Sequence, residues 1–276
     1  MPPALPEMVF DPIGRLAEAG LGVLGAVVLV LLVAAVETGF RVGLRRQRRG
    51  APPGAQAAVG FVTTGMLGSF AFLLGIALSM ASARYEQRRH AVLDEANAIG
   101  TAFLRAQAIG GPDAHSIAAA LRAYVVLRHQ AVAAGVAERH PARIAALQAR
   151  MWAAAGRIAR AAPTTISGLL LRALNDAFDA QLVTRRDFTS HVPSYLLALL
   201  LGASLLAAGA MGYHFGLGGA RDVVMTCLLL GLVTFSIVVV VDIDRPGAGG
   251  IRVSAAPLLW TAQGMGAADG GGGRLP

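Results

Sequence analysis

Four long apolar runs divide the chain, at about residues 20–36, 57–83, 195–213 and 223–241. A helix needs about 20 residues to cross roughly 30 Å of hydrocarbon, and about 17–25 residues is the usual range. Each run meets this requirement. Buried helices of a soluble core are the alternative, and they account poorly for four runs of this length. The pattern therefore predicts an all-α, polytopic membrane protein with four transmembrane helices.

The second run differs from the others because small residues recur along it at four-residue spacing, beginning with Gly60, Thr64 and Gly68. Such spacing lets helix backbones approach closely in lipid. One interpretation is a tightly packed helix pair. The other is a helix that lines a narrow pore around a symmetry axis, with Phe61, Phe70 or Phe72 as apolar constrictions. The candidate pore-lining residues are Phe61, Thr64, Gly68, Phe72, Gly75 and Ser79.

None of the four runs has an ionisable residue at its centre. Proton relays and ion-coupled transporters usually need such a residue within the membrane. Its absence argues against an active transporter. A passive channel stays possible, since an apolar gate can close by dewetting.

Residues 84–192, between the second and third runs, predict a helical extramembrane domain. Alanine, leucine and arginine dominate this segment, without strand-like alternation. Glycine and proline breaks divide it into helices at about residues 84–109, 114–133, 141–161 and 166–191. Asp113 and Thr165 are the expected caps. No breaker follows residues 57–83, so we expect the second span to continue into the domain as one helix.

The predicted organisation has four parts. They are an N-terminal transmembrane hairpin (1–83), the helical domain (84–192), a C-terminal transmembrane hairpin (193–243) and a tail (244–276). The last ~12 residues of the tail are rich in glycine, which favours disorder there.

A polar stripe marks the first helix of the domain. It consists of Asp94, Asn97, Thr101 and Arg105, with Glu95 beside it. Their spacing places the four stripe residues on one helix face. The stripe is a solvated face, a hydrogen-bonded seam against another helix or a neighbouring subunit, or a ligand or ion site. Asn175, Asp176 and Asp179 on the fourth helix are candidate partners.

Charged residues also follow the fourth run, where Asp242, Asp244 and Arg245 come within four positions. Carboxylates at a helix C-terminus are disfavoured by the helix dipole and need compensation. Arg245 or Arg105 can supply it, so we expect Arg105 to meet this cluster in space. Two local carboxylates are too few for calcium, which takes six to eight oxygen ligands, and no metal is assigned. Ile251, Val253 and Pro257 are then expected to pack the tail against the helical domain.

Composition and charge narrow the function classes. The chain is 55% hydrophobic and only 14% charged, against about 25% charged residues in soluble domains. All 24 basic residues are arginines, and five of them lie between Arg41 and Arg49, directly after an apolar run. That position is typical of topology-setting charge, not of nucleic-acid binding. We find no catalytic motif, no histidines at metal-ligand spacing and one cysteine, Cys227, and we predict no enzyme and no cofactor.

The arginines give conflicting evidence on orientation. The five in the first loop favour a cytoplasmic loop, which would place the helical domain outside. Arg84, Arg88 and Arg89 after the second run, and Arg185 and Arg186 before the third, favour the opposite orientation. The sequence leaves the orientation open.

Two stretches resemble the bacterial bestrophin-like domain family of membrane proteins. The first runs from Arg84-Tyr85-Glu86 through Leu93 to Ala106, and the second begins at Asp242-Ile243-Asp244-Arg245-Pro246 and continues to Pro257-Leu258. Bestrophins are pentameric anion channels in which the second span lines the neck and acids after the fourth span help hold calcium. The resemblance therefore implies a homo-oligomer, a pentamer by analogy, with inorganic anions as permeant partners. It also implies a multi-pass protein of the bacterial inner membrane with a cytoplasmic helical domain. The tail lacks the long acidic run of bestrophins, which puts calcium gating in doubt.

Two functions follow from these features. The first is an oligomeric, anion-permeable channel whose second span lines the axis. The alternative is a non-conducting membrane scaffold or sensor whose helical domain binds a partner. The oligomeric state separates them, since one or two copies cannot surround an axial pore.

Overall fold

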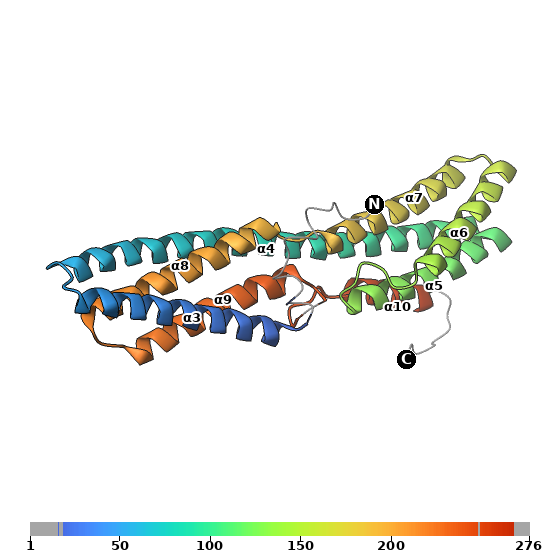
Figure 1. Cartoon of the computed structure of the whole chain (residues 1–276). Helices are drawn as coiled ribbons and strands as arrows, with labels where there is room; N and C mark the ends of the chain where they lie inside the picture. Colours follow the sequence, from blue (N-terminus) through green and yellow to red (C-terminus); the bar gives the residue numbers. More distant parts are fainter. Residues whose placement is uncertain (1–15, 17–18, 248, 268–276) are drawn as a thin grey trace. The chain divides into compact units, whose positions relative to one another are not determined.

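A computed structural model of the chain describes residues 16, 19–247 and 249–267 (Figure 1). Within these residues the chain is helical and contains no strand, which confirms the all-α prediction. The helices in chain order are α3 (Leu21–Arg48), α4 (Ala55–Ile109), α5 (Gly111–Ala133), α6 (Pro141–Ala161), α7 (Thr165–Thr189), α8 (Ser194–Gly218), α9 (Val223–Asp244) and α10 (Ala256–Ala267).

Four helical segments of the described chain are long and apolar enough to cross a bilayer. They are α3, α4, α9 and the helical run that contains α8, and each includes one of the four predicted apolar runs. The predicted continuation of the second span is confirmed, because α4 runs unbroken for 55 residues. It ends where Gly110 and Gly111 take positive φ values of 69° and 84°, a conformation that glycine adopts readily.

The chain forms two compact units, which are described separately. The membrane unit comprises Met1–Ala83 and His191–Gly250, and the helical unit comprises Arg84–Ser190 and Ile251–Pro276. The membrane unit therefore holds α3, the first half of α4, α8 and α9. The helical unit holds the second half of α4 with α5, α6, α7 and α10.

Helices α3 and α8 are in extensive contact within the membrane unit. A Cβ atom on Gly39 or Gly43 of α3 would overlap the α8 backbone, and one on Gly212 or Gly216 of α8 would overlap the α3 backbone. Glycines four residues apart lie on one helix face and let two backbones touch. A close glycine contact was predicted only for the second span, and this pair was not predicted.

Apolar side chains fill the rest of the membrane unit. Leu24, Val28 and Leu32 of α3 cluster with Val233 and Ile237 of α9 and with buried residues of α4 and α8. On the outer side of α9 the large residues Leu228, Leu232 and Phe235 are 62–66% exposed. Large apolar side chains exposed in this number are typical of helices that face lipid or another subunit.

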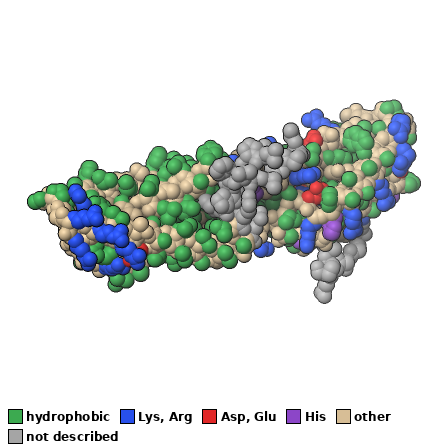
Figure 2. Space-filling view, in the orientation of Figure 1, with side chains coloured by type: hydrophobic (Ala, Val, Ile, Leu, Met, Phe, Trp, Pro, Cys, Tyr) green, Lys and Arg blue, Asp and Glu red, His purple; other side chains and the backbone are tan. Residues whose placement is uncertain are grey.

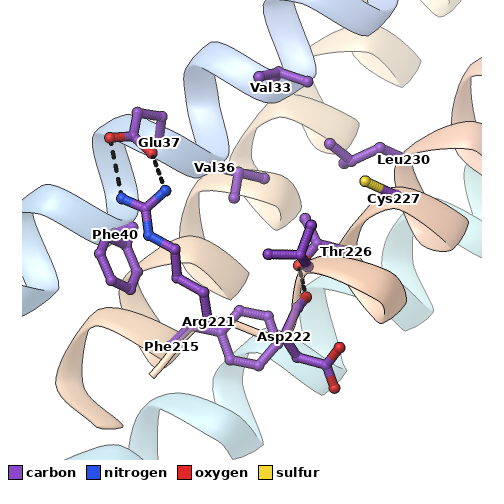
Figure 3. A pocket seen from close by; sticks show the side chains of 11 residues that line it. Val33, Val36, Glu37, Phe40, Phe215, Arg221, Asp222, Thr226, Cys227 and Leu230 are labelled. Atoms are coloured by element: carbon purple, nitrogen blue, oxygen red, sulfur yellow. Dashed lines mark hydrogen bonds and ion pairs between the residues drawn. The ribbon is translucent and has the colours of Figure 1, made fainter. Parts of the chain in front are cut away.

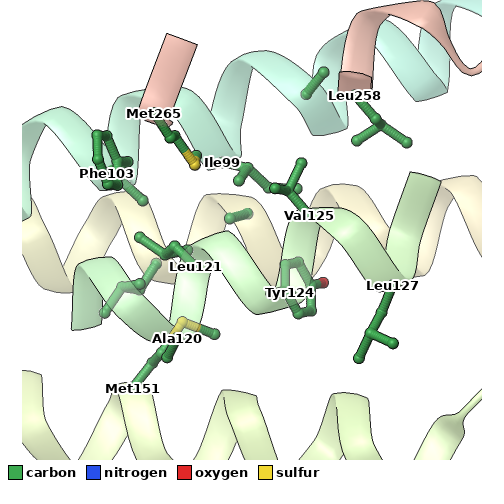
Figure 4. Close-up of a cluster of buried hydrophobic side chains, with 14 of the residues drawn as sticks. Ile99, Phe103, Ala120, Leu121, Tyr124, Val125, Leu127, Met151, Leu258 and Met265 are labelled. Atoms are coloured by element: carbon green, nitrogen blue, oxygen red, sulfur yellow. The ribbon is translucent and has the colours of Figure 1, made fainter. Parts of the chain in front are cut away.

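The core of the helical unit is built from all of its helices (Figure 4). Ile99 and Phe103 of α4 pack with Tyr124 of α5 and Met151 of α6. The tail contributes Leu258, which is fully buried. Helix α10 was not predicted from the sequence.

The tail agrees only partly with its prediction. Val253 is buried, Pro257 is half-buried and Ile251 is exposed. Helix α10 continues to Ala267 and buries Met265. The disorder expected for the last ~12 residues stays a prediction. The rest of that segment, residues 268–276, lies outside the described residues.

Both predicted caps need correction. Helix α7 is capped by Thr164, not Thr165, in a reciprocal pair with Ser167, which satisfies backbone N–H groups that the helix leaves unpaired. Gly110 holds the cap position of α5, and Asp113 lies in its first turn. There Asp113 accepts a hydrogen bond of 2.7 Å from Arg157 of α6, which lowers the pKa of the Asp113 carboxyl.

Candidate functional site: the uncovered face of α4

The six candidate pore residues lie on one face of α4 that no other part of the described membrane unit covers. All six are exposed, and their helical spacing places them in one stripe. They are Phe61, Thr64, Gly68, Phe72, Gly75 and Ser79. Phe61 and Phe72 are 83% and 69% exposed, which is unusual for phenylalanine. We call this stripe the small-residue face of α4.

Three glycines on or beside this face have no neighbouring side chain or helix among the described residues. A Cβ atom on Gly65, Gly68 or Gly75 would meet no atom within 4 Å. The hydroxyl of Thr64 donates to the carbonyl of Gly60 in its own helix at 3.0 Å, so it needs no partner helix. The described chain therefore contains no tight helix pair at this face, and a second copy of the chain can still provide one.

The opposite side of α4 fixes how the helix is rotated. Phe70, Ala77 and Ala81 are buried in the core of the membrane unit. Phe70 was one of three phenylalanines proposed as constrictions, and its burial separates it from Phe61 and Phe72. The other two point away from the core, so the small-residue face is presented outward by the packing of the chain itself.

In the helical unit, most of the predicted polar stripe is solvent-exposed. Asp94, Asn97 and Thr101 are exposed, and Arg105 donates a hydrogen bond of 2.7 Å to the carbonyl of Leu169 on α7. The proposed partners on α7 do not meet the stripe, because Asn175 donates instead to Asp179 at 2.8 Å. Within one chain the stripe is a surface, and a seam with a neighbouring subunit stays a prediction.

Glu95, beside that stripe, is buried with Arg128 of α5. Both side chains are 0% exposed. Arg128 donates from Nε and Nη2 to the two carboxylate oxygens, the second at 3.1 Å, and from Nη1 to the carbonyl of Ala137 at 2.9 Å. This bidentate arrangement compensates two charges taken out of water. Burial alone would lower the pKa of Arg128, but the hydrogen bonds and charge of Glu95 outweigh this effect and raise it.

Tyr124 lies in the same core, next to this pair. Burial, and to a lesser degree the negative charge of Glu95, raises the pKa of the Tyr124 hydroxyl. The nearby Gln148 amide donates to the Tyr124 oxygen at 3.4 Å. Tyr124 therefore stays neutral and contributes mainly as a core residue.

The acids after the fourth span act within the membrane unit. Asp244 is almost fully buried, and its Oδ1 accepts a hydrogen bond of 2.8 Å from the backbone N–H of Val192. His191 lies 3.7 Å from the other carboxylate oxygen. Asp244 thus ties the end of α9 to the start of α8. Asp242 and Arg245 are half-buried beside it, and the expected meeting of this cluster with Arg105 stays a prediction.

Two arginines of α4 have structural roles that were not predicted from the sequence. Arg88 is fully buried and donates to the carbonyls of Asp187 at 3.0 Å and Ser190 at 2.7 Å. Arg84 donates to the Ser190 hydroxyl. These contacts satisfy carbonyls at the end of α7, where a helix leaves its last carbonyls unpaired. A clue was present in the sequence, since Arg88 continues the apolar stripe of Val92 and Ile99.

The described residues contain no cluster of three or more His, Cys, Asp or Glu side chains that could hold a metal ion. Cys227 is exposed on α9 and is the one cysteine of the chain. The exposed arginines of the membrane unit gather at the end where α3 meets α4 (Figure 2). This end is the strongest concentration of positive charge on that unit.

Comparison with known proteins gives a consistent picture. A model of the bestrophin-like domain matches residues 24–258 of the chain. The crystal structure of a bacterial bestrophin homologue from Klebsiella pneumoniae is similar over 91% of this chain and 98% of its own, with a TM-score of 0.64 and 14% identity. A point mutant of that homologue covers 88% and 98%, with a TM-score of 0.63 and 14% identity. No curated protein matches the sequence. At such identity the structural likeness concerns the fold alone.

Proposed function

The chain belongs to the bestrophin-like domain family, and on this premise we propose that it forms an oligomeric, anion-permeable membrane channel whose axis is lined by α4. The observation that carries the proposal is the small-residue face of α4. It lies on a membrane-spanning helix, it is uncovered within one chain, and the packing of Phe70 and Ala77 holds it outward.

In a symmetric ring of copies, the small-residue face of α4 would line the central axis. One chain with four spanning helices cannot enclose a path, whereas copies related by rotation bring the same face to a shared axis. Glycine and serine at the axis keep the helices close together. Phe61 and Phe72 then form apolar rings, which gate ion flow by excluding water. By analogy with bestrophins we expect five copies.

Positive charge at one end of the membrane unit supports anion permeation. Arg45, Arg46, Arg48 and Arg49 are exposed at the end of α3 and just beyond it. Rings of arginine favour anions in pores, and clustered positive charge raises the local anion concentration. An oligomer would repeat this cluster once per subunit around the axis.

Chloride flux out of liposomes tests the proposal. Purified full-length protein is reconstituted, and chloride efflux is followed with an ion-selective electrode. Phe72→Ala removes one apolar ring and is expected to increase chloride flux. The matched control is Phe235→Ala on α9, which is 66% exposed against 69% for Phe72 but lies outside the small-residue face.

Two results would refute the channel. One is the absence of chloride flux in the wild type and in Phe72→Ala while a known channel conducts in the same liposomes. The other is a mass of the intact detergent complex that corresponds to a monomer or dimer. Equal changes of chloride flux in Phe72→Ala and Phe235→Ala would contradict the proposal that α4 lines the axis.

The alternative function is a membrane scaffold or sensor. Trp260 of α10 and Leu182 of α7 are 65% and 56% exposed on the helical unit, which is favourable for binding a protein partner. A stable monomer without flux would favour this alternative.

We further propose a multi-pass location in the bacterial inner membrane. Its orientation is tested by a single cysteine at Ala51, between α3 and α4, in a Cys227→Ala background. Labelling by a membrane-impermeant thiol reagent in intact cells would place that turn outside. Labelling only after lysis would place it in the cytoplasm.

A further inference from the structure

A pocket of about 200 Å³ lies in the membrane unit between α3, the end of α8 and the start of α9 (Figure 3). Its walls are mostly apolar, with Val33 and Val36 from α3 and Leu230 from α9. Phe40 and Phe215 contribute aromatic rings. The pocket lies away from the small-residue face of α4, so it has no role in the proposed axis.

The polarity of the pocket changes along the helices. α3 and α9 run antiparallel, since a Cβ on Gly25 would contact Val238 far from the start of α9, while Glu37 binds Arg221 just before it. The end near Val33 and Leu230 is therefore apolar, and the end near Glu37 and Arg221 is charged. The charged end coincides with the arginine-rich end of α3, where a spanning helix reaches the lipid headgroups.

The charged end of the pocket has more N–H donors, from Arg41 and Arg221, than its carboxylate Glu37 can accept. The Glu37 carboxylate accepts hydrogen bonds from Arg41 Nε at 2.7 Å and from Arg221 Nη1 and Nη2 at 2.8 and 3.3 Å. A guanidinium group carries five N–H donors, so the two arginines have more donors than Glu37 can accept. Their side chains are 68% and 50% exposed. Arg221 is held in place over the Phe40 ring, 3.9 Å from its centroid.

The positive charge that favours an anion at this end comes from arginines beside the pocket. Two arginines face one carboxylate, and the other acid of the pocket, Asp222, accepts from the backbone N–H of Met225 at the start of α9. With Asp222 the local charges cancel. The exposed arginines that follow Arg41 on α3 then give this end its positive charge.

We propose that this pocket binds an anionic phospholipid, with part of one acyl chain between α3 and α9 and the phosphate at Arg41 and Arg221. Pockets that enclose a whole drug-sized ligand measure about 300–1,000 Å³, so a pocket of about 200 Å³ suits a segment of a longer molecule. Burial of the methylene groups of an acyl chain against these apolar walls favours binding. The site stands on the membrane unit alone, so it holds whether or not the protein conducts ions.

Cys227 lines the pocket and is the one cysteine of the chain, so the unmodified protein carries its own reporter. The full-length protein is placed in nanodiscs of phosphatidylcholine with rising fractions of phosphatidylglycerol. The rate of Cys227 modification by N-ethylmaleimide is then followed by intact mass. At a lipid level about ten times its Kd, mass action leaves roughly one pocket in ten empty, and the rate falls about tenfold. Protein denatured in SDS gives the unprotected rate.

The comparison arms identify what protects Cys227. Phosphatidylcholine discs with added inorganic phosphate are expected to show no protection, because the acyl chain is required. In Arg41→Gln/Arg221→Gln the dependence on phosphatidylglycerol is expected to disappear. A rate that does not depend on phosphatidylglycerol overturns the proposal. So does a thiol that is unreactive in every disc, since a second copy of the chain would then cover the pocket.

A second measurement does not depend on the thiol. Native mass spectrometry counts the phosphatidylglycerol molecules that stay bound to the protein. Cys227→Phe fills the pocket and is expected to remove one lipid per chain. Leu228→Phe places the same aromatic ring at the neighbouring position, which is 63% exposed and does not line the pocket. Equal lipid counts in the two variants would overturn the assignment.

Discussion

Replacement of Arg128 by methionine is expected to destabilise the folded chain by about 3–5 kcal/mol. The change leaves the Glu95 carboxylate, which is 0% exposed, without its bidentate partner. It also removes the donor that Arg128 supplies to the carbonyl of Ala137. A buried charge without a partner is costly because the protein interior cannot replace its hydration.

The double replacement Glu95→Leu/Arg128→Met separates the two contributions. Apolar residues of similar volume in place of a buried ion pair are often neutral or stabilising by about 1–4 kcal/mol. The Ala137 carbonyl still lacks its donor, at a cost of about 1–3 kcal/mol. We therefore expect the double variant to recover most of the stability that Arg128→Met loses.

Thermal unfolding of the full-length protein in detergent measures both effects. One kcal/mol shifts the Tm of a chain of about 150–250 residues by roughly 2–4 °C, so Arg128→Met is expected to lower the Tm by about 6–20 °C. Arg143→Met on α6 is the control, since Arg143 is exposed and should change stability by less than about 0.5 kcal/mol. If the double variant unfolds as early as Arg128→Met, the unpaired charge is not the cause of the loss.

Three further predictions concern the contacts described above. Gly212→Ala should destabilise the membrane unit by about 1–3 kcal/mol, because the added Cβ overlaps α3. Gly202→Ala on the same helix meets no atom within 4 Å and should be neutral. Thermal unfolding in detergent compares the two variants, and an equal loss of stability would contradict the glycine contact. Asp244→Ala should cost about 1–3 kcal/mol in the same assay because a buried N–H loses its acceptor, and an unchanged Tm would contradict this. Arg157→Gln should lower stability only while Asp113 is ionised. Because the folded pKa of Asp113 is lowered, its contribution is present above about pH 3.9 and is lost as the pH falls through the folded pKa. A Tm difference between wild type and variant that persists at acid pH would exclude the ion pair as its cause.

The sequence predicts the helices well because their signals are local. Each apolar run must be helical to satisfy its backbone groups in lipid, and glycine and proline mark where the helices of the domain break. Helices α5, α6 and α7 accordingly begin within a few residues of their predicted starts. The cap of α7 was misplaced by one residue, because Thr164 and Thr165 are equally suitable in sequence.

The polar contacts were harder to predict, because sequence shows the spacing of residues but not the face that becomes buried. Asp94 and Glu95 are neighbours, yet only Glu95 continues the buried stripe of Val92 and Ile99. Arg128 interrupts the buried stripe of α5 in the same way. Charges of opposite sign within the apolar stripes of two consecutive helices, Glu95 on α4 and Arg128 on α5, are the signal that could have identified this pair.

The same limit applies to the glycines. Four-residue spacing shows that a backbone can approach closely, but it does not name the partner. The spacing in the second span suggested a close contact on α4, but a Cβ atom at position 65, 68 or 75 would meet no atom of the described chain within 4 Å. The realised contact lies between Gly39 and Gly43 of α3 and their counterparts on α8, and part of it falls beyond the predicted end of the first span.

The glycine contact between α3 and α8 also limits how the membrane unit can move. Two backbones in direct contact have no side chains between them that could change rotamer and allow sliding. A shift of α3 along α8 would drive one peptide group into the next, so these two helices should move as one body. The side-chain contacts of α4, at Phe70, Ala77 and Ala81, have more freedom to adjust. Conformational change in the membrane unit is therefore expected as a rotation or tilt of α4 against a fixed α3–α8 pair.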